Sequence, residues 1–545
     1  MLLPVIVDLA LSARERVFAY LAADAFYYLT VARNVVDHGI FSFDQQHLTN
    51  GFHPLWQGLL AALFGLGRGL GLGELAVLQA VVITGSLCLA VGLVLLGAAL
   101  AKGGRVSPFV TTLPLGAFAL LVAPLWLWVG DELPRHNGFE GSLPLQGTFW
   151  GYANGMESAA VVLALGLYTF WLVRGPRARP GLYSAGLGVG LALLTFSRLD
   201  HVFFSAALLL MLLLDPPLPE RRRETAVVAG LVFALLLGSY LVTNRAVFGA
   251  WLPVSGTLKS TFPRVHVQNF RHLAAMLAAL PDFYIGVLMR QVRLWLPLLT
   301  AALWLGPRLR PAWQRWRART PVATGEAWMD FFALGVLVWC LYNLLFVPVM
   351  SQGLWYFAAP TLFVGLVAVR GLDALALRWS WRSESAWTLA GVVALSLWCF
   401  LSLHRHADTH RHYAAFYFDE SVRVRKHYAA SPPRLISFDD GIVAFATGFP
   451  TMSATGFMLD PPAVAAQREG RLLDLALSRG YDRITSLVYL RRAVTPELGR
   501  AVPAAVRGYG SQALAGQDLG HTTFALDYYS EPGRFAILRA APATR

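Results

Sequence analysis

Long apolar runs separated by short polar loops dominate this chain of 545 residues. Hydrophobic residues make up 56% of the chain, charged residues only 14%, and the mean hydropathy is +0.52. An ordinary soluble globule does not have this balance, so we predict an all-α polytopic membrane domain. Ten apolar runs are the predicted spans: 75–100, 109–130, 156–173, 181–196, 201–214, 225–244, 283–304, 330–349, 354–370 and 386–403.

Basic residues are distributed unevenly among the loops, and their distribution predicts the topology. Five alternate loops carry sixteen Lys and Arg residues, whereas the four loops between them carry six. Cytoplasmic loops are enriched in Lys and Arg, so the first set is predicted to face the cytoplasm of a plasma (inner) membrane protein. The net charge of +13 then reflects topology in the lipid bilayer, and no nucleic-acid partner is expected.

Residues 24–56 form a polar, acid-bearing segment between apolar ones. The topology places this segment on the outer face. The run 55–66 would be about 18 Å of helix against about 30 Å of hydrocarbon, so it is expected to lie at the outer interface. One more crossing before Asp24 is then required, which gives about eleven transmembrane helices in all.

The tail after residue 403 differs in pattern from the spans. LISFDD alternates like a strand, AAQREGRLLDLALSRG is typical of one amphipathic helix, and ITSLVYL and RFAILRA have strand patterns. We therefore predict a transmembrane domain at 1–403 and a small α/β soluble domain at 404–545. The second domain is expected on the periplasmic or extracellular side, with the active site.

Asp24 and the aromatic residues after it are the first candidate site residues. A carboxylate where the first span leaves the membrane is suited to accept a proton from an acceptor hydroxyl. Tyr27 and Tyr28 offer faces for a sugar ring, although an interfacial aromatic belt would give the same pattern.

The outer loops carry further ionisable and aromatic residues near the ends of spans. Ionisable groups at membrane depth cost free energy, and they tend to be paired or functional. A local Arg198–Asp200 ion pair and a surface lysine at Lys259 are the structural alternatives to a binding site. The set comprises Asp44, Asn50, His53, Glu157, Arg198, Asp200, Lys259, Trp355 and Tyr356.

These segments together resemble the GT-C superfamily of membrane glycosyltransferases, which take sugars from polyprenyl-phosphate carriers. The resemblance is to a bacterial branch with a DDAFYYL…TNGFHPLW first outer loop, a GMES helix start, an R-x-D turn and an FG-x-x-LP…K segment. Arabinofuranosyltransferases look similar to that branch. The similarity spans residues 20–370, and Ala23 stands here where the branch has the first acid of its pair.

The resemblance implies an inverting transfer in which Asp24 is the general base. The sugar, arabinofuranose in the similar enzymes, moves to a glycan or protein hydroxyl, and the carrier phosphate leaves toward basic groups. Arg198 and Lys259 are the main candidates for that phosphate, with Arg33 and His53 as weaker ones. The expected substrate contacts are Tyr27, Tyr28, Asp44, Asn50, Glu157, Asp200, Trp355 and Tyr356.

No cofactor is implied with certainty. Asp44 and Glu157 offer oxygen ligands for a divalent cation, but no tight ligand spacing requires one. All three cysteines lie in apolar runs, which argues against a thiolate metal site. GLGVG at 186–190 is typical of close helix packing rather than of a phosphate loop. HRHADTHRH at 404–412 is interpreted as an interfacial linker.

A transporter or flippase of lipid-linked saccharides is the main alternative. Such a protein would carry ionisable residues through mid-span positions and a pseudo-symmetric pair of broken helices. Here the ionisable residues gather at the outer ends of spans, with Arg290 and Arg293 as the main exceptions. A membrane anchor for a binding domain in the tail is a third reading, and it leaves the outer-loop acids unexplained.

Overall fold

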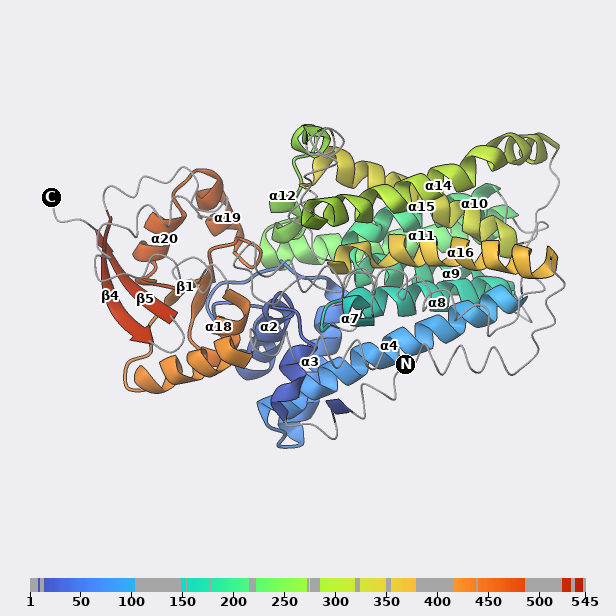
Figure 1. Cartoon of the computed structure of the whole chain (residues 1–545). Helices are drawn as coiled ribbons and strands as arrows, with labels where there is room; N and C mark the ends of the chain where they lie inside the picture. Colours follow the sequence, from blue (N-terminus) through green and yellow to red (C-terminus); the bar gives the residue numbers. More distant parts are fainter. Residues whose placement is uncertain are drawn as a thin grey trace.

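In the computed structural model of this chain, a bundle of long helices adjoins a smaller mixed domain at the C-terminus (Figure 1). A short segment from the N-terminal part of the chain lies between them. The structure describes residues 8–9, 14–102, 149–152, 154–175, 179–214, 222–271, 274, 285–318, 324–348, 354–378, 415–437, 440–485, 522–530 and 535–542.

Four helices in the described part of the chain are long and apolar enough to cross a membrane: α4 (Glu74–Lys102), α9 (Pro180–Ser197), α11 (Arg222–Phe248) and α15 (Thr324–Phe346). The predicted spans at 109–130 and 386–403 lie outside the described residues, so the total of about eleven stays a prediction. Four further helices complete the described bundle: α8 (Ser158–Arg174), α10 (Val202–Leu214), α14 (Ile285–Ala318) and α16 (Ala358–Arg378).

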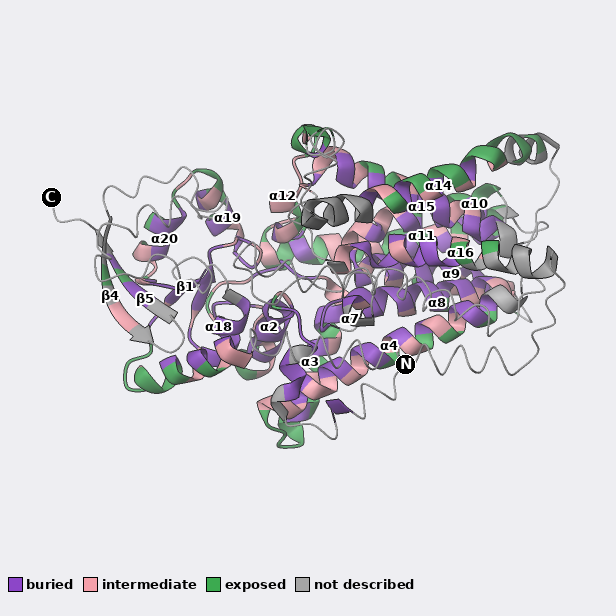
Figure 2. Ribbon diagram, in the orientation of Figure 1, coloured by how far each residue is buried: buried purple, intermediate pink, exposed green. Residues whose placement is uncertain are grey.

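Small residues allow the bundle helices to approach closely. A Cβ added at Gly188 of α9 would lie 2.5 Å from the Ala229 carbonyl oxygen of α11. The prediction that GLGVG serves helix packing is therefore confirmed at Gly188. Figure 2 shows buried residues along the facing sides of the helices and exposed residues on their outer sides.

Residues 24–69, which we call the first outer segment after their predicted side, form a buried layer rather than an open loop. They form α2 (Ala25–His38) and α3 (Pro54–Gly69), and the first ten residues of α2 are all buried. Before it, η1 (Arg14–Ala19) is a 3-10 helix, and the Asp8 carboxylate accepts a hydrogen bond of 3.1 Å from Arg16. The rest of the crossing expected before Asp24 lies outside the described residues.

The C-terminal domain is built on a five-stranded mixed sheet in the order β2-β1-β3-β5-β4. β1 pairs in parallel with β2 and β3, whereas β5 is antiparallel to β3 and β4. A helix over 415–427 precedes the sheet. The elements are β1 (Leu435–Ser437), α18 (Asp440–Thr447), β2 (Thr451–Ser453), α19 (Pro461–Arg468), α20 (Leu472–Ser478), β3 (Arg483–Thr485), β4 (Thr522–Ser530) and β5 (Phe535–Pro542).

One element of this domain corrects the sequence prediction. AAQREGRLLDLALSRG was expected to form a single amphipathic helix, but it forms the end of α19 and all of α20. Gly470 between them has a φ of 70°, a left-handed conformation that ends α19 and that glycine adopts readily.

The C-terminal domain packs directly on the first outer segment. In Figure 1, α18 lies beside α2. Arg33 of α2 donates a hydrogen bond of 2.5 Å to the Phe445 carbonyl of α18, and Thr49 donates one of 3.1 Å to the Leu459 carbonyl. A Cβ added at Gly51 would lie 1.8 Å from the Phe457 carbonyl oxygen, so only glycine fits there. The first outer segment is thus held between the bundle and the C-terminal domain.

Candidate active site

A buried ion network lies where α8 begins and α9 ends. Arg198 follows α9, and Glu157 occupies the N-cap position of α8. The Arg198 guanidinium donates to Glu157 Oε1 at 2.7 Å and to Asp200 Oδ1 at 2.8 Å. Arg198 is 2% exposed and Glu157 1%. Two carboxylates thus face one guanidinium, and the predicted Arg198–Asp200 pair is confirmed as part of a larger network.

His53 adjoins this network as a neutral imidazole. The Leu199 backbone N–H donates to His53 Nδ1 at 3.2 Å, and His53 Nε2 lies 3.6 Å from Glu157 Oε1. Burial, reinforced by the Arg198 charge, lowers the pKa of His53 to about 3. Nδ1 therefore accepts and Nε2 carries the proton, which leaves His53 without the positive charge that would attract a phosphate.

Tyr356 connects Arg198 with Lys259. It lies on η5 (Leu354–Phe357), and the Arg198 guanidinium carbon is 3.8 Å from the centre of its ring. The Lys259 ammonium donates a hydrogen bond to the Tyr356 hydroxyl. The backbone carbonyl of Trp355, the preceding residue, accepts a hydrogen bond of 3.3 Å from Arg198. The structure therefore brings both main phosphate candidates to one aromatic side chain.

Lys259 ends the short helix α12 (Val254–Lys259), whose start is held by Asn50. Asn50 Oδ1 accepts from the Val254 N–H at 3.0 Å, and its amide donates to the Leu252 carbonyl at 3.3 Å. The Lys259 ammonium also lies 4.0 Å from the centre of the Phe457 ring. No described carboxylate pairs with Lys259, so its positive charge is available to an anion.

The Asp24 carboxylate is not part of the hydrogen-bonded ion network, although the charge of Lys259 acts on it as it does on Glu157 and His53. Asp24 is partly exposed at the N-cap position of α2, where its side chain makes no capping hydrogen bond. No described residue forms a hydrogen bond or ion pair with this carboxylate. Burial raises the pKa of Asp24, and the positive charge of Lys259 partly opposes that increase. A carboxylate without an ion-pair partner can remove a proton from one substrate group while an ammonium that acts on it electrostatically binds an anion.

Three predicted site residues are not brought into this cluster. Asp44 accepts hydrogen bonds from His47 at 2.7 Å and from the Tyr481 hydroxyl at 2.8 Å, and so links the first outer segment to the C-terminal domain. Arg33 binds carbonyls of α18, as described above. The Tyr27 hydroxyl lies 3.3 Å from Thr455 Oγ1 of the C-terminal domain.

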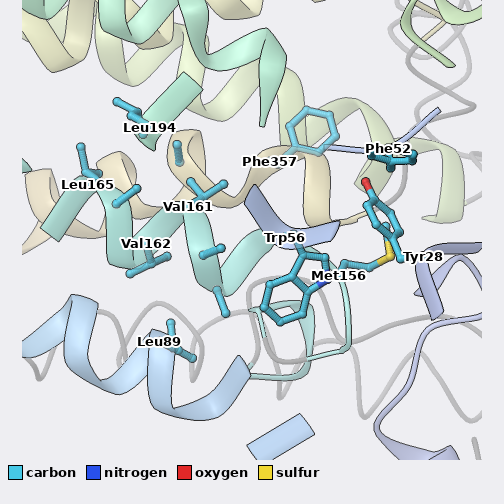
Figure 3. Close-up of a cluster of buried hydrophobic side chains, with 14 of the residues drawn as sticks. Tyr28, Phe52, Trp56, Leu89, Met156, Val161, Val162, Leu165, Leu194 and Phe357 are labelled. Atoms are coloured by element: carbon cyan, nitrogen blue, oxygen red, sulfur yellow. The ribbon is translucent and has the colours of Figure 1, made fainter. Parts of the chain in front are cut away.

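Tyr28 lies at the apolar base of the site. Figure 3 shows it with Phe52, Trp56 and Met156 in one cluster that continues along α8. Its ring centre is 6.5 Å from that of His53, and its hydroxyl is close enough to interact electrostatically with Glu157. The charged groups therefore border a closely packed apolar cluster, which excludes water on one side of them.

Several contacts of this site have no counterpart among the sequence predictions. Trp339 Nε1 donates to Asp200 Oδ2 at 2.9 Å, and the ring of Phe457, 198 positions after Lys259, contacts the Lys259 ammonium. His201 is fully buried, and neither ring nitrogen has a hydrogen-bond partner in the part described. A tryptophan within a span and a phenylalanine in a turn carry no sequence signal for such roles.

No metal centre is formed by the described residues. They include no group of three or more His, Cys, Asp or Glu side chains placed to hold an ion. Cys88 and Cys340 are free thiols. The histidines at 404–412 and Cys399 lie outside the described residues.

Comparison with solved structures bears on the fold. No protein-family model matches the chain, and no curated protein matches it. The structure of ArnT from Cupriavidus metallidurans in the apo state matches with a TM-score of 0.51 and 12% identity, over 95% of this chain and 93% of ArnT. ArnT bound to undecaprenyl phosphate has a TM-score of 0.48 and 13% identity, over 99% of this chain and 97% of ArnT. The similarity to apo ArnT shows that this chain shares the fold of that protein.

Proposed function

We propose that this chain is an inverting, polyprenyl-phosphate-sugar-dependent glycosyltransferase of the plasma membrane. It would move a sugar from the lipid carrier to a hydroxyl of a glycan or protein on the outer face. Arabinofuranose is the sugar that the sequence resemblance favours. The proposal rests on the shared fold, on the charge bias of the loops and on the Asp24–Lys259 arrangement.

One observation carries the proposal: Asp24 and Lys259 have no ion-pair partner among the described residues, and the positive charge of Lys259 lowers the pKa of Asp24. In the proposed reaction, Asp24 accepts the proton of the acceptor hydroxyl as that oxygen bonds to the anomeric carbon. The bond between the anomeric carbon and the phosphate oxygen breaks on the opposite side. The electron pair leaves with the phosphate, whose growing charge Lys259 stabilises.

Arg198 has a different proposed role from that given by the sequence alone. Two carboxylates already balance its charge, and its side chain is 2% exposed. It is therefore poorly placed to offer a full positive charge to a phosphate. We assign it to positioning: it lies against the Tyr356 ring and holds the Trp355 carbonyl, and Tyr356 in turn accepts the hydrogen bond from Lys259.

The transporter alternative finds less support in the placement of charge. Glu157 lies at the N-cap of α8 and Arg198 just beyond α9, so the ion network lies at helix ends rather than along a path through the described bundle. The base Asp24 also precedes a helix that is not among the candidate spans.

A donor panel tests the function. Purified protein in detergent would be incubated with polyprenyl phosphates carrying different sugars, arabinofuranose among them, with Asp24→Asn as the matched variant. We expect release of free polyprenyl phosphate from at least one donor by the wild type and not by the variant. No release from any donor, with and without added glycan acceptors, would refute the proposed reaction class.

A further inference from the structure

The connection after α11 presents large apolar side chains to the outside. Within residues 249–271, Phe262 is 66% exposed and Trp251 55%. They belong to a set that we call the apolar loop surface: Trp251, Leu252, Phe262, Val265, Val267 and Phe270, all exposed. Exposed apolar patches of this kind in a loop mark a contact with a partner or with lipid.

The apolar loop surface follows the C-terminal end of α11 and is hydrogen-bonded to the C-terminal end of α15. The Thr261 N–H donates to the Phe346 carbonyl at 2.7 Å, and the His266 N–H donates to the Leu345 carbonyl at 2.6 Å. The Asn269 amide donates to the Val347 carbonyl at 2.8 Å. These bonds satisfy carbonyls at the C-terminal end of α15. The loop therefore lies against the end of a candidate span, at the same end of the bundle as Lys259.

The apolar loop surface continues the lipid-facing side of α11. Only 22% of the most apolar stretch of α11 is buried. Val227, Leu231 and Leu235 are each more than half exposed, and their spacing of four residues places them on one helical face. Val242 and Val247 extend the exposed apolar residues toward Trp251. Exposed apolar residues thus occur both on this candidate span and in the loop that follows it, with Ser239, Thr243 and Arg245 exposed between them. Apolar residues that are exposed on a span and in its adjoining loop are suited to lipid rather than to water.

The charge of this loop complements anionic headgroups. Residues 245–281 contain no Asp or Glu. Arg245, Arg264 and Arg271 are exposed, and no described carboxylate pairs with them. Tryptophan and arginine are typical of the membrane–water interface, where basic groups bind lipid phosphates.

We propose that residues 249–271 dock onto the bilayer leaflet on the side of the candidate site. The apolar loop surface would enter the boundary between headgroups and acyl chains, and the arginines would bind the phosphates of anionic lipids. Because α12 lies within this connection, docking holds Lys259 at headgroup level. The inference concerns a membrane contact, so it does not depend on glycosyl transfer.

Depth-dependent quenching tests this contact. Single cysteines would replace Phe262 or Val265 in a chain without its three native cysteines, and each would carry an environment-sensitive fluorophore. The protein would be placed in nanodiscs of phosphatidylcholine with a quencher on the acyl chain near the headgroup. Leu231→Cys on the lipid-facing side of α11 is the control inside the membrane. Ser431→Cys, exposed on the C-terminal domain, is the control in water.

We expect labels at 262 and 265 to be quenched within about twofold of the label at 231, because interfacial elements enter about 5–10 Å. Quenching no greater than that at 431 would overturn the proposal. Adding phosphatidylglycerol should increase quenching at 262, and Arg264→Gln with Arg271→Gln should abolish that increase. An unchanged increase in the double variant would refute the role of the arginines. Concentration-dependent shielding of both labels in detergent would instead identify a second copy as the partner.

Discussion

Replacement of Arg198 by methionine should destabilise the protein more than replacement of either carboxylate near it. Arg198 and Glu157 are almost fully buried and lie 2.7 Å apart. Removing one partner of a buried pair costs on the order of 3–5 kcal/mol, because the other charge remains without compensation. Glu157→Gln keeps a side-chain oxygen that accepts from Arg198, so its cost should stay below about 2 kcal/mol.

The triple variant with Arg198→Met, Glu157→Gln and Asp200→Asn shows whether uncompensated charge causes the loss of stability. It has no unpaired buried charge, so it should be more stable than Arg198→Met alone although it carries more substitutions. The deficit of Arg198→Met should also depend on pH. Without the guanidinium, burial raises the pKa of Glu157 still further, so the folded state holds that proton more tightly than the unfolded state. The deficit should therefore be larger at high pH and smaller at low pH.

The assay is the free energy of unfolding in mixed micelles titrated with SDS and followed by tryptophan fluorescence, at several pH values. Wild-type stability in Arg198→Met would refute the reasoning. A triple variant less stable than Arg198→Met would refute it as well, since the cost would then come from lost packing and not from uncompensated charge.

Three more predictions follow from single contacts. Lys259→Gln should move the acid limb of the kcat/KM profile to higher pH, because the charge that lowers the pKa of Asp24 is lost. Lys259→Arg keeps the charge and should leave the limb in place. An unmoved limb in both variants would show that the Lys259 charge does not act on Asp24. The pKa of His53 falls from 6.5 to about 3 on burial, so the free energy of unfolding should decline as pH drops through this range. His53→Gln should flatten this decline, measured by SDS titration. An unchanged slope would show that protonation of His53 does not contribute to the decline. Gly51→Ala places a Cβ 1.8 Å from a carbonyl oxygen of the C-terminal domain and should make that domain more sensitive to limited proteolysis. Gly58→Ala, whose added Cβ would have no atom within 4 Å, should not. Equal sensitivity of the two variants would contradict the close contact at Gly51.

Much of the membrane domain could be predicted because its sequence signals are local. An apolar run of sufficient length predicts a span by itself, and α4, α9, α11 and α15 occur where those runs lie. The proximity of Glu157 to Arg198 could also be anticipated, because both lie at ends of predicted spans, where buried charges tend to pair.

The connection between the two domains could not be predicted, because its contacts join residues about 400 positions apart. Asp44 has a carboxylate of the kind that binds substrates, but this carboxylate accepts a hydrogen bond from the Tyr481 hydroxyl. Arg33 has the charge of a phosphate ligand, but it binds the Phe445 carbonyl. A single sequence does not encode which distant surface a polar side chain will meet. The same reason hides Phe457, whose contact with Lys259 depends on how the C-terminal domain docks.

The central claim is that Asp24 is the base, and its direct test is the transfer rate of Asp24→Asn with a polyprenyl-phosphate sugar under saturating donor. Asparagine keeps the size of the side chain but cannot accept the proton, so the rate should fall by about 10²–10⁴-fold while carrier binding and membrane insertion stay unchanged. Asp24→Glu, which keeps a carboxylate, should retain more activity than the asparagine variant. A rate for Asp24→Asn close to that of the wild type would contradict the account.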